Sequence, residues 1–166
     1  MSGANESITI VRANYADADH AAAIIALLDG YARDASGGGV PLRDEVKREL
    51  VSVLAGCANA LTLLAYCNDE PAGLLNAFET VSTFNARPLL NIHDIAVSTQ
   101  FRRRGIARAM MDALEQIARE RGCCKITLEV LEGNLGAQTL YREVGFAAYS
   151  LKEAFGRALF WQKPLA

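Results

Sequence analysis

The stretch FRRRGIAR, residues 101–108, decides how this chain is interpreted. It follows the apolar run LLNIHDIAV at 89–97, which predicts a strand. It also opens the segment 101–122, which predicts a helix because its apolar residues recur at helical spacing: Ile106, Ala109, Met110, Ala113, Leu114, Ile117 and Ala118. The stretch is therefore expected at a strand-to-helix junction, with the helix beginning near Arg104 and Gly105.

A helix start of this kind predicts a binding site for a phosphate or pyrophosphate. The first helical turn presents free backbone N–H groups and the positive end of the helix dipole. Gly105 has no side chain and Ala107 almost none, so a ligand can approach the backbone, and Arg102, Arg103 and Arg104 add positive charge. On this stretch alone, a solvated basic helix start is an equal alternative. The chain contains neither a Walker P-loop nor a Rossmann glycine motif.

Composition limits the class of protein. The 166 residues, 51% hydrophobic and 22% charged, are typical of a globular chain and predict one domain over 1–166. The net charge of −2 argues against a nucleic-acid partner, which usually needs a broad basic face. No apolar run approaches the length of a membrane span, and the first residues lack the pattern of a signal peptide. The expected location is cytoplasmic, with no membrane partner.

The cysteines and histidines do not predict a metal site. Cys57, Cys67, Cys123 and Cys124 form no C-x-x-C pair, and the chain has only two histidines. We therefore expect no metal, and we interpret the four cysteines as buried free thiols.

The remaining segments predict a mixed sheet covered by helices, an α/β or α+β fold. Further helices are predicted at 17–32, capped by Asp17 or Asp19, at 42–56 and at 135–145; further strands are predicted at 6–14, 60–67, 72–83, 123–131, 146–151 and 157–165. The helix at 42–56 has an apolar stripe of Val46, Leu50, Val53 and Leu54. The first strands form an antiparallel meander, and the β-α-β unit around 101–122 should be parallel and right-handed.

Two motifs in order resemble the GNAT superfamily of acetyl-CoA-dependent N-acetyltransferases. The family signature [QR]-x-x-G-x-[GA] stands at 102–107, after a strand and at the start of a helix. A second signature, N-x-x-A-x-x-L-Y-x-x-x-G-F, is matched at Asn134, Ala137, Leu140, Tyr141, Gly145 and Phe146. The resemblance covers essentially the whole chain and implies a mostly antiparallel sheet, about four flanking helices and a parallel pair of strands that splay apart to admit the cofactor.

The resemblance also implies which residues hold acetyl-CoA. Its pyrophosphate would lie on the backbone N–H groups of Arg104, Gly105, Ile106 and Ala107, with charge from Arg102 and Arg103. Its pantetheine arm would pair with the backbone of Ile95, Ala96 and Val97, and Asn134 would reach the edge of the cofactor. The family often has proline in the turn after the strand, where this chain has Thr99 or Gln100.

Acetyl transfer to an amine needs an acid for the departing thiolate and a route for the amine proton. Tyr141 occupies the family's tyrosine position, so the resemblance favours it as the acid; the alternative is an amphipathic core residue. The base is open. In related spermidine/spermine acetyltransferases a glutamate stands where this chain has His93, and imidazole can accept a proton near neutral pH. Glu79 and Asp94 are rivals, His93 is equally well a sheet residue, and water can also carry the proton.

Strand alternation places His93 and Asp94 on opposite faces unless a bulge intervenes. The acceptor groove is expected between the first two helices, the loop 34–42 and the segment 79–88, with Asp34, Glu79 and Asp94 as acids and Tyr31, Phe78 and Phe84 as apolar walls. The favoured acceptor is a small-molecule primary amine. A protein lysine or N-terminal amine, and a non-catalytic acetyl-CoA-binding regulatory domain, are alternatives. Related proteins are often dimers, which makes a homodimer an alternative to a monomer.

Overall fold

The computed structural model describes residues 7–150, 152, 154, 156 and 158–165. Its contacts divide the chain into two compact units, an N-terminal unit Met1–Leu128 and a C-terminal unit Glu129–Ala166. The expectation of one domain over 1–166 stays a prediction. No helix among the described residues is both long and apolar enough to cross a membrane.

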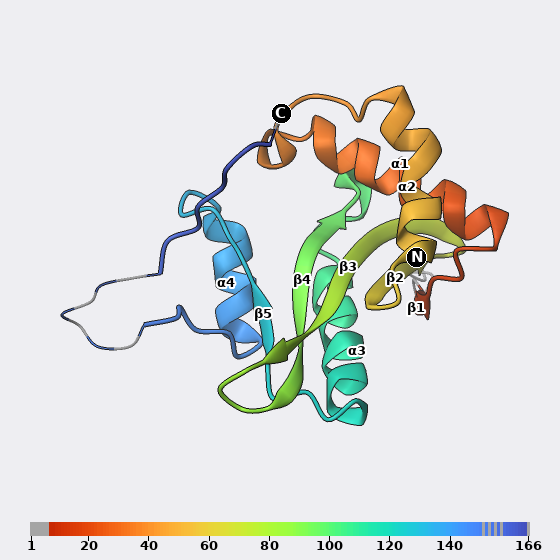
Figure 1. Cartoon of the computed structure of the whole chain (residues 1–166). Coiled ribbons are helices and arrows are strands. Elements are labelled where there is room, and N and C mark those ends of the chain that lie inside the picture. Colours follow the sequence, from red (N-terminus) through yellow and green to blue (C-terminus); the bar gives the residue numbers. More distant parts are fainter. Residues whose placement is uncertain (1–6, 151, 153, 155, 157, 166) are drawn as a thin grey trace. The chain divides into compact units, whose positions relative to one another are not determined.

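The N-terminal unit is built on a five-stranded mixed sheet in the order β1-β2-β3-β4-β5 (Figure 1). Its strands are β1 (Ile8–Arg12), β2 (Ala60–Cys67), β3 (Glu70–Ser82), β4 (Arg87–Val97) and β5 (Ile126–Leu128). Strands β1 to β4 pair with one another in antiparallel orientation, and β5 runs parallel to β4. This confirms the mixed sheet with one parallel pair, although the strand predicted over 123–131 is reduced to three residues.

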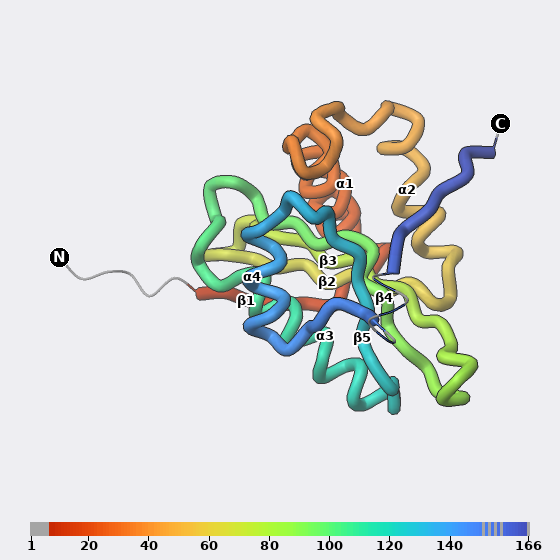
Figure 2. Tube along the Cα trace, turned by 90° about the vertical axis from the view of Figure 1, so that its left-hand side faces the viewer, coloured from red at the N-terminus to blue at the C-terminus, as the bar shows by residue number. Residues whose placement is uncertain are grey.

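Helices cover both faces of this sheet. α1 (Ala18–Arg33) and α2 (Asp44–Gly56) lie on one face, and α3 (Ile106–Glu120) lies on the other (Figure 2). On the first face, buried residues of α1 pack on β2 and β3 in a cluster that includes Ile24, Leu27, Leu64 and Leu74. On the second, α3 buries Ile106, Met110, Met111, Leu114 and Ala118. The predicted helical stripe of α3 is therefore confirmed in its main positions.

Local sequence accounts for most element ends. Asp17 caps α1 by accepting from the backbone N–H groups of Asp19 and His20, as expected for one of the two candidates. The β2–β3 hairpin turns at Asn68 and Asp69, with φ of 50° and 66°; this left-handed pair is the geometry that two-residue hairpins favour. In α2, however, Val53 is 58% exposed, whereas Leu54 is buried. The assignment of Val53 to the apolar stripe was therefore wrong.

The C-terminal unit contains α4 (Leu135–Glu143), as the sequence predicts. The two strands predicted after it, at 146–151 and 157–165, are wrong over their described residues: only Ser150 forms an isolated bridge. Leu151 and Arg157 lie outside the described residues. Leu159, Phe160 and Trp161 are exposed, so the apolar run that predicted the last strand buries little surface. An apolar run forms a strand only where a neighbouring strand can complete its hydrogen bonds.

All four cysteines are free thiols; Cys67 is buried, and Cys57, Cys123 and Cys124 are half-buried. In the described part of the chain, no group of three or more His, Cys, Asp or Glu residues is arranged to hold a metal ion.

Candidate functional site

The loop between β4 and α3 forms the helix start that the sequence predicts. After the short 3-10 helix η2 (Thr99–Phe101), the chain turns through Arg103, with φ of 61°, and Gly105, with φ of 81°. Gly105 is the N-cap of α3, and among the described residues no side chain caps this helix. The Ala109 N–H donates to the Gly105 carbonyl at 2.9 Å and begins the helical hydrogen bonding. The amides of the first turn are thus available to an external acceptor.

Gly105 combines a left-handed backbone with open space. A Cβ built on this residue would meet no described atom within 4 Å. A side chain here would therefore meet open space at the N-terminus of α3. The absence of a side chain keeps that space accessible to a ligand that binds the backbone.

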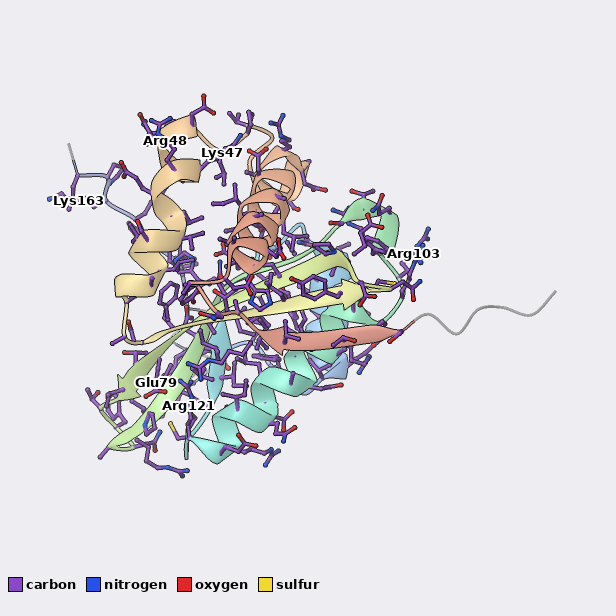
Figure 3. All side chains as sticks on the ribbon, turned by 90° about the vertical axis from the view of Figure 1, so that its right-hand side faces the viewer. Lys47, Arg48, Glu79, Arg103, Arg121 and Lys163 are labelled. Carbon is purple, nitrogen blue, oxygen red and sulfur yellow. The ribbon has the colours of Figure 1, made fainter. Side chains whose placement is uncertain are left out.

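The arginines around Gly105 differ in their contacts. Arg102 donates from Nε to the Val97 carbonyl at 3.2 Å and from a terminal nitrogen to the Asp34 carboxylate at 2.6 Å. Arg104 donates to the Gln100 carbonyl at 2.9 Å, and its guanidinium lies 5.4 Å from the centre of the Phe101 ring. Arg103 is exposed at the loop before α3 (Figure 3). The charge of Arg102 is thus largely committed to Asp34, and Arg103 is the more accessible cation.

A bulge in β4 sets the orientation of its second half. Ile92 pairs with Ala77, and Asp94 pairs with Asn76, so His93 is an extra residue in the ladder. The parallel pairing of β4 with β5 extends from Leu90 to Ile92. Past the bulge, β4 continues to pair with β3 on its other edge as far as Val97.

Backbone direction past the bulge distinguishes the three predicted pantetheine residues. The N–H of Ser98 donates to the Ala72 carbonyl of β3 at 2.9 Å. Because backbone groups alternate along a strand, Ala96 also faces β3, whereas Ile95 and Val97 face away from it. The contact of Arg102 with the Val97 carbonyl agrees with this direction. Ile95 and Val97 are therefore the two whose backbone groups are directed to the outer edge of β4.

The same bulge brings His93 and Asp94 to one face of the sheet. The His93 ring meets the Phe78 ring edge-on, with centres 5.7 Å apart. His93 Nδ1 lies 3.8 Å from Asp94 Oδ1, and Asn76 donates to Asp94 Oδ2 at 3.0 Å. Simple alternation would place the two residues on opposite faces, and the extra residue in the strand is the bulge that overrides it.

The end of α1 adds charge to this face. Burial, and then the charges of Asp94 and Asp34, raise the pKa of Tyr31, so its hydroxyl stays a hydrogen-bond donor. The Arg102 guanidinium holds the pKa of Asp34 well below its usual range, with further hydrogen bonds from the backbone N–H and hydroxyl of Ser36. Asp34 is thus an anion paired with a cation.

Glu79 is not brought together with His93. Its carboxylate accepts from Arg121 at 2.8 Å, and Arg121 caps the end of α3 on the opposite face of the sheet. Figure 3 shows the two side chains together, at the other end of the sheet from Arg103.

Asn134 is the N-cap of α4, and Tyr141 lies within that helix. The Asn134 side chain accepts from the Ala137 N–H at 3.2 Å and so caps the helix. The Tyr141 ring lies 6.0 Å from that of Phe146, and the Tyr141 carbonyl accepts from the Phe146 N–H at 2.8 Å.

A buried chain of polar side chains, not predicted from the sequence, leads to Asp94. The Tyr15 hydroxyl lies 2.9 Å from the Thr62 hydroxyl, which donates to Asn76 Oδ1 at 2.7 Å. A signal was present: Thr62 is the one polar residue in the run 60–65, and Asn76 is the one polar residue in the run 71–78. Their strand register, which brings them together, was not readable from either strand alone.

Comparison with known proteins gives a family. The model of the acetyltransferase (GNAT) family matches residues 23–146, which include strands β2 to β5, the β4–α3 loop and α4. A thialysine N-epsilon-acetyltransferase of Caenorhabditis elegans is 30% identical over 92 residues, 55% of this chain and 57% of that protein. A streptothricin acetyltransferase of Streptomyces lavendulae is 39% identical over 82 residues, 49% of this chain and 43% of that protein. The chain thus spans about half the length of these two curated relatives.

Among solved structures, an aminoglycoside N-acetyltransferase in complex with CoA has a TM-score of 0.75 and 18% sequence identity, covering 99% of this chain and 100% of that one. At this identity the likeness concerns the fold.

Proposed function

Because the chain belongs to the acetyltransferase (GNAT) family, we propose that it transfers the acetyl group of acetyl-CoA to a primary amine of a small molecule, by direct attack in a ternary complex. The relatives named for thialysine and streptothricin support a small amine-bearing acceptor. The observation that carries the proposal is the junction of β4 and α3, where the outward backbone of Ile95 and Val97 leads to the uncapped first turn at Gly105.

The residues at this junction fit the cofactor. The first-turn amides at Ile106 and Ala107 and the guanidinium of Arg103 would hold the two phosphates, which need donors and positive charge. The open space at Gly105 leaves room for them. The amide and carbonyl groups of Ile95 and the amide of Val97 would pair with the amides of the pantetheine arm, as a neighbouring strand would, while the Val97 carbonyl accepts from Arg102. Acetyl-CoA supplies the activated acetyl group.

The amine would be received on the face that carries His93 and Asp94. A lysine-like amine is mostly protonated at neutral pH, with an ordinary pKa of about 10, and must lose a proton before it can attack. Asp94 would attract the cation, and the His93 imidazole would take the proton. Since Glu79 is paired with Arg121 on the other face, it has no part in this scheme.

Tyr141 would protonate the sulfur that leaves when the new carbon–nitrogen bond forms, and Asn134 would support the cofactor. Both assignments rest on the sequence resemblance. The ammonium loses two protons in all. His93 takes the one lost before attack and passes it to solvent, and the one lost as the amide forms balances the proton that is delivered to the thiolate.

The test is release of free CoA thiol by the purified protein with acetyl-CoA and a panel of amines: polyamines, lysine analogues, aminoglycosides, streptothricin and peptides with lysine or a free N-terminus. Turnover on a small amine supports the proposal. Turnover on peptides alone identifies a protein acetyltransferase. Tight acetyl-CoA binding without turnover on any amine identifies a regulatory domain and overturns the proposal.

A further inference from the structure

We propose that Thr62 and Asn76 are positioning residues that hold the carboxylate of Asp94 in one orientation beside His93, so that it can receive a cationic acceptor amine. This inference rests on the proposed function. It begins with the register of the sheet: Thr62 of β2 lies opposite Asn76 of β3, and Asn76 lies opposite Asp94 of β4. Directly opposed residues have neighbouring side chains on the same face. Three strands thus contribute one continuous polar row.

The bulge at His93 completes this row. Counting on from the pair of Ala77 with Ile92, an unbroken ladder would place His93 opposite Asn76. The extra residue shifts the register by one and places Asp94 there instead. The local irregularity therefore has a specific result: it joins the carboxylate to the buried amide and leaves the imidazole next to it.

The hydrogen bonds of the row have one direction. The Thr62 hydroxyl has a single proton and donates it to Asn76 Oδ1, so the contact with Tyr15 requires the Tyr15 hydroxyl to donate. Asn76 then donates from its amide nitrogen to Asp94 Oδ2. The opposite amide orientation would place the Asn76 oxygen against the carboxylate. Every donor in the row thus points toward the negative charge of Asp94.

Burying the polar side chains of Thr62 and Asn76 costs folding free energy, and their positions suit them to orient Asp94. Thr62 is 1% exposed and Asn76 is 4% exposed, in strands whose other residues on this face include Leu64 and Leu74. Buried polar groups must be fully hydrogen-bonded to be tolerated, and apolar residues would fill these positions at lower cost. The row ends at a carboxylate whose side chain is 28% exposed.

Asp94 is held from one side only. Its Oδ2 accepts from Asn76, and its Oδ1 is directed toward His93. Within the described residues, no lysine or arginine pairs with it, in contrast to Asp34, Asp29 and Glu79, which all have such partners. A positively charged amine is the ligand that this arrangement suits, with its proton near the His93 imidazole.

The experiment compares Thr62→Val, Asn76→Leu and Thr62→Ser with the wild type, using the best acceptor from the amine panel. Thr62→Val keeps the shape of the side chain and removes the hydroxyl. We expect Asn76→Leu, which removes a hydrogen bond to the Asp94 carboxylate, to raise the acceptor KM about tenfold. Thr62→Val removes only the neutral hydrogen bond to Asn76 and should raise it about threefold. The acetyl-CoA KM should stay unchanged in both variants. Thr62→Ser, which retains the hydroxyl, should restore the acceptor KM. The matched control is Ser82→Ala, which removes a buried hydroxyl that lies in β3, outside the polar row.

The unchanged acetyl-CoA KM also shows that each variant is folded. An acceptor KM that is unchanged in Thr62→Val, with normal turnover in the wild type, overturns the positioning role and leaves the proposed function intact. Equal increases in the two KM values indicate a structural role and also overturn it. Absence of turnover in the wild type with every amine overturns the proposed function and this inference with it.

Discussion

Arg102 donates to the carboxylate of Asp34 at 2.6 Å and thereby ties the loop after α1 to the loop before α3, although the two residues are 68 positions apart. A second bond of Arg102, to the Val97 carbonyl, extends the contact to the end of β4. The acceptor side of the proposed site is thus physically connected to the cofactor side within the N-terminal unit.

This pair predicts a specific acid sensitivity. Because the pKa of Asp34 is held below its usual range, the unfolded chain binds a proton on this group more readily than the folded protein does. The stabilisation is complete above the ordinary aspartate pKa of about 4 and declines as the pH falls through the acid range. Asp34→Asn should therefore lower the urea midpoint at neutral pH, and its difference from the wild type should narrow in acid. Asp112→Asn, at an exposed position of α3, is the control; a difference that is constant with pH contradicts the prediction.

The proposed ligand-binding role of Gly105 can be tested separately from its left-handed backbone conformation by comparison with Gly122. Gly105 and Gly122 both have positive φ, of 81° and 69°, and a Cβ at either would meet no described atom within 4 Å. Alanine at each position should cost about 1 kcal/mol of folding stability. Only Gly105→Ala should also weaken acetyl-CoA binding, by about tenfold or more, because only that Cβ enters the proposed phosphate site. Calorimetric titration measures this, and equal affinities in the two variants would remove the phosphate site from Gly105.

Tyr141 is expected to act on the chemical step. Tyr141→Phe should lower kcat about a hundredfold, the usual size of a general-acid contribution, with acetyl-CoA affinity nearly unchanged. Tyr149→Phe removes an exposed hydroxyl from the same unit and is the control. Wild-type turnover in Tyr141→Phe contradicts the acid role and leaves Tyr141 as a packing residue beside Phe146.

His93 is tested by the pH dependence of its replacement. His93→Ala should lower kcat about a hundredfold near neutral pH, and part of the activity should return at alkaline pH, where a larger fraction of the amine is already neutral. Steady-state rates from neutral to alkaline pH measure this. Unchanged turnover at neutral pH would show that the proton leaves through water and that His93 is a sheet residue packed on Phe78.

Prediction from sequence succeeded where the signal was local. The capping role of Asp17, the β2–β3 hairpin and the helical face of α3 each depend on residues within a few positions of one another. It failed for the strands after α4, because an apolar run does not specify a neighbouring strand. It did not predict the pairing of Arg102 with Asp34, since the two residues lie far apart in the sequence.

The sequence by itself determined the helix start at Gly105, because a positive φ before an apolar helical face depends on local backbone preference. It also determined the family, through two motifs in order. Only the tertiary structure decided which side chains stand together beside β4. That depends on strand register. The extra residue at His93 moves every later side chain of β4 to the opposite face of the sheet. No local preference in 89–97 specifies that Asp94, rather than His93, meets Asn76; the packing of three strands does.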